Sequence, residues 1–373
     1  MPFSIFIKQF FAKEKKYGSK DRKQIASLCY NYFRAGLALN KNITAENLLA
    51  AFFIVLNKPA DLIKELKPEW HGSEIKTVEE KSKLLPFLFN LKEVFPFVSS
   101  LNCHTNIDLL CHSILQQPYV FARIRPQHKK QTVEKIRTGA VEYTFLNNES
   151  CVQFLPGTNI EKFLLPDKEV SIQDYNSQLV LDYIKQSSFV ASREEIKVWD
   201  CCAASGGKSI LLYDLLNGNI RLTVSDIRQS IIANLQHRFK NAGIKNYKSL
   251  VADISNPEAK LSFDKYDIII CDAPCTGSGT WARAPEQLYF FNPASIDEFA
   301  TKQKRIAANA IKHLNNNGLF FYITCSVFEK ENEGVAEYIS KEEGIELLEI
   351  KNLIGYGMKA DSMFVAVLRK HGQ

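Results

Sequence analysis

The spacing of hydrophobic residues divides the chain into a helical front and an α/β back. Up to about residue 115, apolar positions recur every three or four residues, as in QIASLCYNYFRAGLAL and ENLLAAFFIVL, which predicts helices. Residues 119–138 predict a strand that Pro126 breaks, followed by a short helix. From about residue 196, hydrophobic runs alternate with amphipathic segments. This rhythm predicts a parallel sheet built from KVWDCC, RLTVSD, YKSLVAD, YDIIICD and GLFFYITC.

These patterns predict three parts. Residues 1–116 form a helical domain, residues 117–166 a small α/β module or linker, and residues 167–373 an α/β domain with a doubly wound, mostly parallel sheet of the Rossmann type. Because ligands of such sheets bind at the carboxyl ends of the strands, we expect the chemistry at the strand tips of the third part.

Composition excludes several classes of protein. The 373 residues are 46% hydrophobic and 24% charged, as in a globular protein. The longest apolar run, Leu48 to Leu56, is too short to cross a membrane, so we expect no membrane partner. The nine cysteines are an odd number and include the adjacent Cys201 and Cys202. We therefore expect no disulfide framework and a reducing, cytoplasmic location.

Positive charge is concentrated at the front. The net charge is +6, and residues 1–150 alone hold 22 basic and 14 acidic residues. Such a front is typical of a module that binds a polyanion, although a solvated helix face is the alternative. The candidates for phosphate contacts are Arg22, Arg34, Arg123, Arg125, Lys129, Lys130 and Arg283.

The segment VWDCCAASGGKS, residues 198–209, predicts a strand, a turn of small residues and a helix. Small residues let a ligand approach the main chain, and the free N–H groups of the helix favour its negative end. Gly207-Lys208-Ser209 also resembles the end of a nucleotide triphosphatase loop, but that loop needs a glycine where Cys202 stands.

Two aspartates favour a sheet that binds S-adenosylmethionine. Asp226 ends the next strand, 20 residues after Gly206, where a carboxylate can accept hydrogen bonds from ribose hydroxyls. Asp253 follows the third strand, where it can hold an adenine amino group. Either aspartate alone could be a helix N-cap, but both in register after successive strands favour the cofactor.

Two cysteines indicate the reaction. Asp272-Ala273-Pro274-Cys275 ends one strand, and Cys325 ends another 50 residues later. Both thiols could simply be buried. Methylation of a pyrimidine carbon, however, requires a thiolate that adds to position 6 of the ring, and an acid such as Asp272 that protonates ring N3.

Over residues 173–373 these motifs closely resemble the Sun/Fmu/Nop (RsmB-like) family of S-adenosylmethionine-dependent RNA 5-methylcytosine methyltransferases, in its bacterial small-subunit rRNA branch. The resemblance implies a seven-stranded methyltransferase sheet, Cys325 as the nucleophile and Cys275 as the thiol that helps to release the product. It also implies that DRKQIASLCYNYFR opens a NusB-like RNA-binding domain. The residues that it assigns to the methyl donor are Cys202, Ala203, Ala204, Ser205, Gly206, Gly207, Lys208, Asp226, Asp253 and Asp272.

The chain departs from the family pattern at several positions, including Ser205, where proline is usual.

We expect a monomer that acts on rRNA, with a tRNA methyltransferase or a non-catalytic RNA-binding assembly factor as the alternatives. We expect no metal, because Cys103-His104 and Cys111-His112 belong to one predicted helix without a CxxC pair.

Overall fold

The chain forms two compact units. The computed structural model describes residues 2–39, 41–102, 104–186, 189, 195–258 and 264–372. Unit 1 comprises Met1–Pro118 and Thr280–Pro293, and unit 2 comprises Tyr119–Gly279 and Ala294–Gln373. The segment Thr280–Pro293 therefore belongs with the N-terminal helices, although it directly follows the Asp-Ala-Pro-Cys motif in the sequence.

Unit 1 is helical, as the sequence predicts. Thr44 accepts a hydrogen bond from the main-chain N–H of Asn47 at the start of α3, and Asn106 caps α6 in the same way. The Phe53 and Trp70 rings stack at the centre of the unit, with ring centroids 4.9 Å apart. The helices are α1 (Phe3–Lys13), α2 (Ser19–Ala35), α3 (Ala45–Val55), α4 (Asp61–Leu66), α5 (Val78–Ser82), α6 (Ile107–Ile114) and α11 (Pro285–Tyr289).

Unit 2 begins with a small antiparallel sheet in the strand order β2-β3-β1-β4. Its strands are β1 (Val120–Ile124), β2 (Tyr143–Leu146), β3 (Cys151–Phe154) and β4 (Val170–Ile172), and α7 (Lys129–Thr138) follows β1. The predicted strand before Pro126 and the predicted helix after it are confirmed. The strands β2 to β4 are only three or four residues long and lie among turns, so the hydrophobic pattern did not reveal them.

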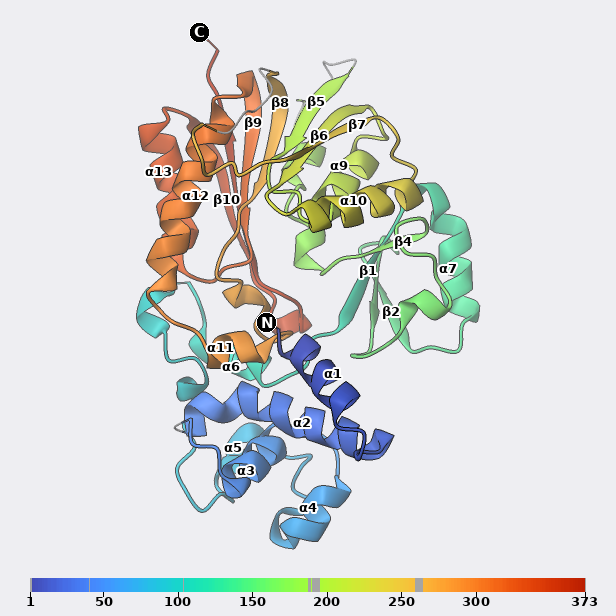
Figure 1. Cartoon of the computed structure of the whole chain (residues 1–373), viewed down its shortest axis with the longest axis vertical. Coiled ribbons are helices and arrows are strands. Elements are labelled where there is room, and N and C mark those ends of the chain that lie inside the picture. Colours follow the sequence, from blue (N-terminus) through green and yellow to red (C-terminus); the bar gives the residue numbers. More distant parts are fainter. Residues whose placement is uncertain are drawn as a thin grey trace. The chain divides into compact units, whose positions relative to one another are not determined.

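The larger sheet of unit 2 has seven strands in the order β10-β11-β9-β8-β5-β6-β7 (Figure 1). Strands β5 to β9 pair in parallel, whereas β10 and β11 add an antiparallel edge. The five predicted strands and the mostly parallel α/β class are confirmed. The strands are β5 (Ile196–Asp200), β6 (Ile220–Asp226), β7 (Tyr247–Val251), β8 (Tyr266–Asp272), β9 (Leu314–Thr324), β10 (Glu346–Leu353) and β11 (Met363–Arg369).

Helices cover both faces of this sheet (Figure 1). Along β5, Val198 points into the apolar cluster with α9 and α10, whereas Trp199 points into the cluster with α12 and α13. Successive strand residues face opposite sides, so continuous apolar strands are needed to fill both clusters. The helices of unit 2, besides α7, are α8 (Tyr183–Gln186), α9 (Gly207–Leu215), α10 (Gln229–Ala242), α12 (Ser295–Ile311) and α13 (Glu333–Glu342).

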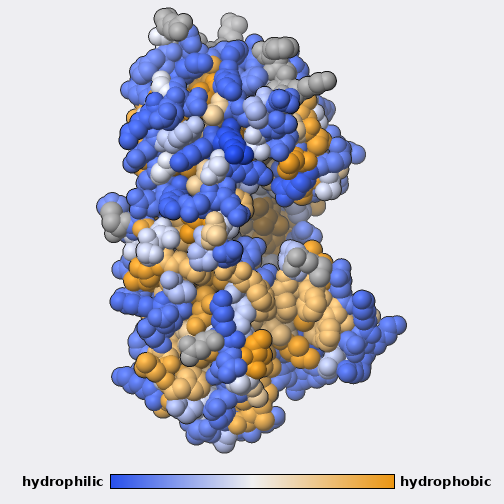
Figure 2. Space-filling view, turned by 60° about the vertical axis from the view of Figure 1, so that its left-hand side comes forward, coloured by the Kyte–Doolittle hydropathy of each residue, from blue (hydrophilic) through white to orange (hydrophobic). Residues whose placement is uncertain are grey.

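The surfaces of the two units differ in polarity. Figure 2 shows a largely hydrophilic surface over α12 and α13, consistent with their exposed lysine and glutamate side chains. Hydrophobic side chains gather on the helices of unit 1 in the same view, and Ile5, Phe6 and Leu88 are among its exposed apolar residues. Among the described residues, no helix is both long enough and apolar enough to span a membrane.

Candidate active site

The glycine loop connects β5 to α9 at the carboxyl edge of the large sheet. Ala204 and Gly206 both have positive φ angles, 44° and 82°, which turn the chain sharply before α9 begins at Gly207. A Cβ atom on Gly206 would lie 2.6 Å from the ring of Phe239, so only glycine fits there. The strand, turn and helix predicted for residues 198–209 are thus confirmed as a local structure.

The predicted cofactor aspartates lie at neighbouring strand ends. Asp226 ends β6 and accepts hydrogen bonds from the main-chain N–H of Ala204, at 3.2 Å, and from the Arg228 guanidinium. Burial opposes ionisation of Asp226, but these hydrogen bonds hold its pKa below the usual value. Asp253 follows β7, and the hydroxyl and main-chain N–H of Ser255 lower its pKa.

Both aspartates line one cavity of about 400 Å³ in unit 2. Cys202 and Ala204 from the glycine loop line it as well, together with Cys275. Apolar side chains such as Ile254 form part of its wall. The structure thus brings together carboxylates, an apolar surface and a thiol that are distant in the sequence, in a cavity of the size that small-molecule ligands occupy.

The two predicted catalytic cysteines lie side by side. β8 and β9 are parallel neighbours with Asp272 beside Ile323, so the segments that follow them leave the sheet together. The Sγ atoms of Cys275 and Cys325 are 3.4 Å apart. The hydrogen bond to Cys325, reinforced by burial, raises the pKa of Cys275 well above its usual value. The surroundings of Cys275 therefore favour its protonated form.

The side chain of Lys208, in the first turn of α9, reaches the Asp-Ala-Pro-Cys motif. Its Nζ atom donates to a carboxylate oxygen of Asp272 at 2.5 Å. Burial disfavours the charged form of Lys208, but the Asp272 carboxylate outweighs it and raises the lysine pKa. A residue predicted only for the cofactor is thus paired with the predicted acid.

A buried carboxylate behind the cysteines was not predicted. Glu331 is fully buried and accepts hydrogen bonds from the main-chain N–H and the hydroxyl of Thr276, at 2.9 and 2.6 Å. It also accepts from Gln303, at 2.9 Å, and from the Ser326 hydroxyl, at 2.5 Å. Thr276 follows Cys275 and Ser326 follows Cys325, so Glu331 ties the two cysteine segments together. In the sequence it stands in the charged run EKENE, which is typical of an exposed turn.

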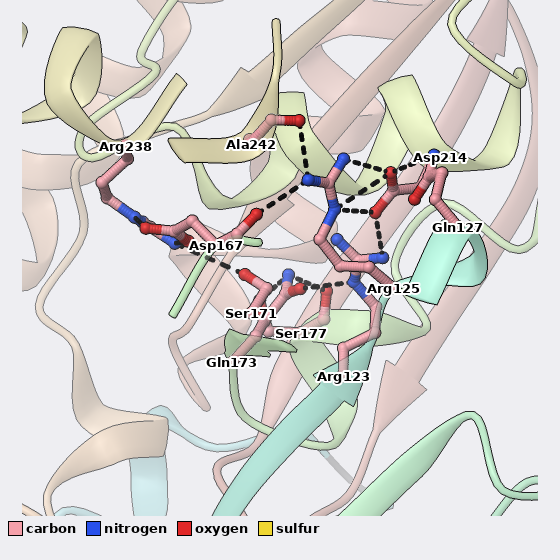
Figure 3. A network of polar contacts seen from close by, with 10 residues as sticks. All are labelled: Arg123, Arg125, Gln127, Asp167, Ser171, Gln173, Ser177, Asp214, Arg238 and Ala242. Atoms are coloured by element: carbon pink, nitrogen blue, oxygen red, sulfur yellow. Dashed lines mark hydrogen bonds and ion pairs between the residues drawn. The ribbon is translucent and has the colours of Figure 1, made fainter. Parts of the chain in front are cut away.

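Three arginines predicted as phosphate contacts are buried, and that part of the prediction is corrected. Arg34 donates to the main-chain oxygens of Ile114 and Gln116 within unit 1. Arg123 and Arg125 both pair with Asp214 of α9, as Figure 3 shows. Clusters of basic residues in the sequence do not reveal a distant acidic partner, and here the charges stabilise the protein interior.

The other four candidates are at least partly accessible. Lys130 and Arg283 are exposed. Arg22 is half-buried and donates to the main-chain oxygen of Tyr17, and Lys129 donates to that of Asn148. These four remain candidates for phosphate contacts. Cys103, part of the metal site considered and set aside above, lies outside the described residues.

Arg238 connects the small sheet module, where Figure 3 shows it beside Asp167, to the glycine loop. Its guanidinium donates to both carboxylate oxygens of Asp167, in the turn before β4, at 2.7 and 2.9 Å. The same group donates to the main-chain oxygen and the hydroxyl of Ser205, both at 2.9 Å. Ser205 thus supplies a hydroxyl to this contact where the related sequences described above usually have proline.

Comparison with known proteins identifies the domain. Residues 188–369 match the family model described as 16S rRNA methyltransferase RsmB/F. These residues belong to the RsmB/F methyltransferase family. The RsmB/F match includes the glycine loop, Asp226, Asp253, Asp272 and both cysteines, whereas the basic candidates of residues 1–150 lie outside it.

Curated relatives of this RsmB/F domain include the probable ribosomal RNA small subunit methyltransferase B of Bacillus subtilis (strain 168). It is 27% identical over 187 residues, which cover 50% of this chain and 40% of that protein. Ribosomal RNA small subunit methyltransferase F of Vibrio vulnificus (strain YJ016) is 26% identical over 171 residues, 43% of this chain and 35% of that protein. The matched segment thus spans 40% or less of either relative's length.

Solved structures share the fold. The crystal structure of PH0851 superposes with a TM-score of 0.73 and 17% identity over 97% of this chain and 93% of that one. The structure of NSun6 from Pyrococcus horikoshii with SFG gives a TM-score of 0.60 and 16% identity over 72% of this chain and 94% of that one. The RsmB/F sheet and its covering helices are therefore a known methyltransferase architecture.

Proposed function

We propose that this chain is an S-adenosylmethionine-dependent RNA methyltransferase that methylates carbon 5 of a cytosine, in small-subunit rRNA. The observation that carries the proposal is the pair of thiols, Cys275 and Cys325, 3.4 Å apart at adjacent strand ends. They follow the ends of the parallel neighbouring strands β8, which ends in Asp272, and β9, and Cys275 lines the cavity with the cofactor aspartates. The printed names of the curated relatives support small-subunit rRNA as the substrate.

The cavity fits S-adenosylmethionine. Asp226 is buried at the end of β6, and the Arg228 side chain that covers its oxygens is 56% exposed and can move aside for ribose hydroxyls. Asp253 offers a carboxylate to the adenine amino group, with Ile254 as an apolar wall. The cofactor supplies the methyl group, as an electrophile on its sulfonium.

Cys325 performs the step that makes carbon 5 reactive. Its thiolate adds to carbon 6 of the ring, so that the electron pair of the 5,6 double bond becomes available at carbon 5. Charge develops at ring N3, where Asp272 can deliver a proton. Because Asp272 accepts a hydrogen bond from Lys208, that proton comes from the lysine ammonium by way of the carboxylate.

Release of the product reverses the addition. A base removes the proton at carbon 5, the 5,6 double bond forms again, and the bond from carbon 6 to the Cys325 sulfur breaks. The proton at ring N3 returns through the Asp272 carboxylate to Lys208. Cys275 assists release from 3.4 Å away, because its protonated thiol can donate a hydrogen bond to the Cys325 thiolate as it leaves. Glu331 holds the segments of both thiols in place.

The substrate must present an unstacked base. Both thiols are half-buried beyond the ends of strands, so the target cytosine has to leave any helix or be single-stranded. We further propose that the helices of unit 1 form a NusB-like RNA-binding domain, that the four accessible basic residues contact phosphates, and that the enzyme acts as a monomer in the cytoplasm.

The proposal is tested with unmodified small-subunit rRNA transcribed with tritium at carbon 5 of cytosine. Methyl transfer at carbon 5 must release one tritium for each methyl group incorporated, and Cys325→Ala must abolish both. Cys29→Ala, which removes a half-buried thiol of unit 1, is the matched control and should leave the rate unchanged. Methyl incorporation without tritium release would place the reaction at another atom, and no transfer to rRNA or tRNA would overturn the proposal.

A further inference from the structure

Three thiols outside the catalytic pair converge at the carboxyl edge of the large sheet. The Sγ atoms of Cys201, Cys202 and Cys271 all lie within 4.8 Å of one another. Among the residues that the structure describes, this is the group of side chains whose spacing suits a shared metal ion.

The strand register assembles this group, which we call the three-thiol cluster. Asp200 of β5 lies beside Ile270 of β8, and the main-chain N–H of Cys201 donates to the oxygen of Ile270 at 2.9 Å. Cys201 and Cys271 are therefore neighbours across the two strands. The chain turns immediately after Asp200, so the alternation of side chains stops and Cys202 can face the same point as Cys201.

The geometry suits a soft cation. Bonds of about 2.3 Å from sulfur to a tetrahedral ion place the sulfurs roughly 3.8 Å apart, so the cluster needs only a small contraction from its present spacing. Cys201 and Cys271 are buried, and both Cys201 and the half-buried Cys202 line the cavity of about 400 Å³. A water molecule can therefore complete the coordination from the cavity, as in zinc sites with three protein ligands.

The charges around the cluster also favour a cation. Asp200 is 1% exposed, and no hydrogen-bond partner for its Oδ1 atom is found in the described part of the chain. A second carboxylate, Asp272, directly follows Cys271. Because the Lys208 ammonium already pairs with Asp272 at 2.5 Å, the group left to favour a cation is the buried Asp200 with its unpartnered Oδ1 atom, together with the thiolates that form on binding.

We propose that Cys201, Cys202 and Cys271 bind one thiophilic divalent cation, Zn²⁺ or its analogue Cd²⁺, through their thiolates. Each thiol gives up its proton to solvent as its bond to the ion forms, so no oxidant or reductant is involved. Binding of the ion does not depend on the proposed function. A second consequence does rest on it: because Cys202 faces the cavity of Asp226 and Asp253, the ion and the methyl donor compete for the same space.

The site is tested by titrating the reduced, metal-free full-length chain with Cd²⁺ and following the ultraviolet absorption of cadmium–thiolate bonds. We expect one ion per chain. Cys271→Ala and Cys202→Ser should each weaken binding by more than the roughly 10- to 100-fold that loss of an outer hydrogen-bond partner costs. Cys202→Ser changes a partly exposed side chain, so it tests the site even if the buried variant fails to fold. Cys111→Ala, a buried thiol of unit 1, is the matched control.

The outcomes separate this proposal from its alternatives. No stoichiometric binding, or unchanged binding in Cys202→Ser, overturns the three-thiol site. Binding that disappears in Cys275→Ala/Cys325→Ala but survives in Cys202→Ser assigns the ion to the catalytic pair and also overturns it. In a second experiment, bound Cd²⁺ should weaken S-adenosylhomocysteine binding at least tenfold. If Cd²⁺ leaves the affinity for S-adenosylhomocysteine unchanged, the ion and the methyl donor do not compete. If the metal-free chain does not bind S-adenosylhomocysteine at all, the result counts against the proposed function and not against the metal site.

Discussion

A substitution of Arg125 distinguishes two roles for the basic residues between 119 and 138: contact with RNA and stabilisation of the protein interior. Its side chain is 3% exposed and donates to both carboxylate oxygens of Asp214, at 2.6 to 3.2 Å. It also donates to the main-chain oxygens of Asp167 and Ala242, both at 2.7 Å. Arg125→Met keeps much of the side-chain volume and removes all of these donors (Figure 3).

The expected loss of stability follows from the burial of this pair. Removing one partner of a buried ion pair costs about 3–5 kcal/mol. We expect the lower end, because Arg123 still neutralises Asp214, which is itself 2% exposed. With a urea dependence of roughly 3 kcal/mol per molar, the unfolding midpoint should fall by about 1 M. Arg137→Met is the control, since Arg137 pairs with Glu149 at the surface, where an ion pair contributes about 0–1 kcal/mol.

The assay combines urea unfolding with the salt dependence of RNA binding, measured at a temperature where the variant is folded. Because Arg125 is used inside the protein, the slope of log affinity against log salt should equal that of the wild type. The reasoning would be refuted if the unfolding midpoint equalled that of the wild type while the slope fell by about 0.7 to 0.9, the value for one lost phosphate contact.

Three further predictions concern the site. The amide in Glu331→Gln cannot accept all four hydrogen bonds that the carboxylate accepts. The kcat for methyl transfer should therefore fall about tenfold, which corresponds to 1.4 kcal/mol, while KM stays unchanged. An unchanged kcat would contradict this prediction. Arg238→Ala releases Ser205 and should raise the calorimetric Kd for S-adenosylhomocysteine about tenfold, or 1.4 kcal/mol; an unchanged Kd contradicts this. Burial raises the pKa of Asp200 to about 7 from 3.8, so the folded state binds more protons between these values. Asp200 should therefore lower the free energy of unfolding by up to about 4 kcal/mol as pH rises from 4 to 7, and Asp200→Asn should remove this slope; parallel unfolding curves against pH would contradict it.

The strand ends were predictable because β5, β8 and β9 contain runs of consecutive apolar residues and β6 has apolar residues at alternate positions. Such runs, each followed by a polar residue or a cysteine, indicate the carboxyl edge of a parallel sheet. Asp226, Asp253 and the two cysteines each end or follow one of these strands, so they lie at this edge, and the order of the strands in the sheet sets which of them are neighbours. The resemblance implied seven strands, but β10 and β11 were not located in the sequence, and β10 is mostly half-buried and lacks a continuous apolar run.

The role of individual charges was not predictable. Arg123 and Arg125 stand in a basic run, and their partner Asp214 lies 91 and 89 residues away on α9. Glu331 similarly looks like a surface residue until the fold places four donors around it. A sequence records the net charge of a segment, whereas burial and pairing depend on which elements come together in the fold.

Trapping of the covalent intermediate tests the central proposal most directly. Cys275→Ala and Cys325→Ala are each incubated with S-adenosylmethionine and unmodified small-subunit rRNA, then separated on a denaturing gel. The account predicts an RNA adduct that survives denaturation with Cys275→Ala, because addition occurs without assisted release, and none with Cys325→Ala. An adduct with Cys325→Ala alone would make Cys275 the nucleophile and contradict the assignment.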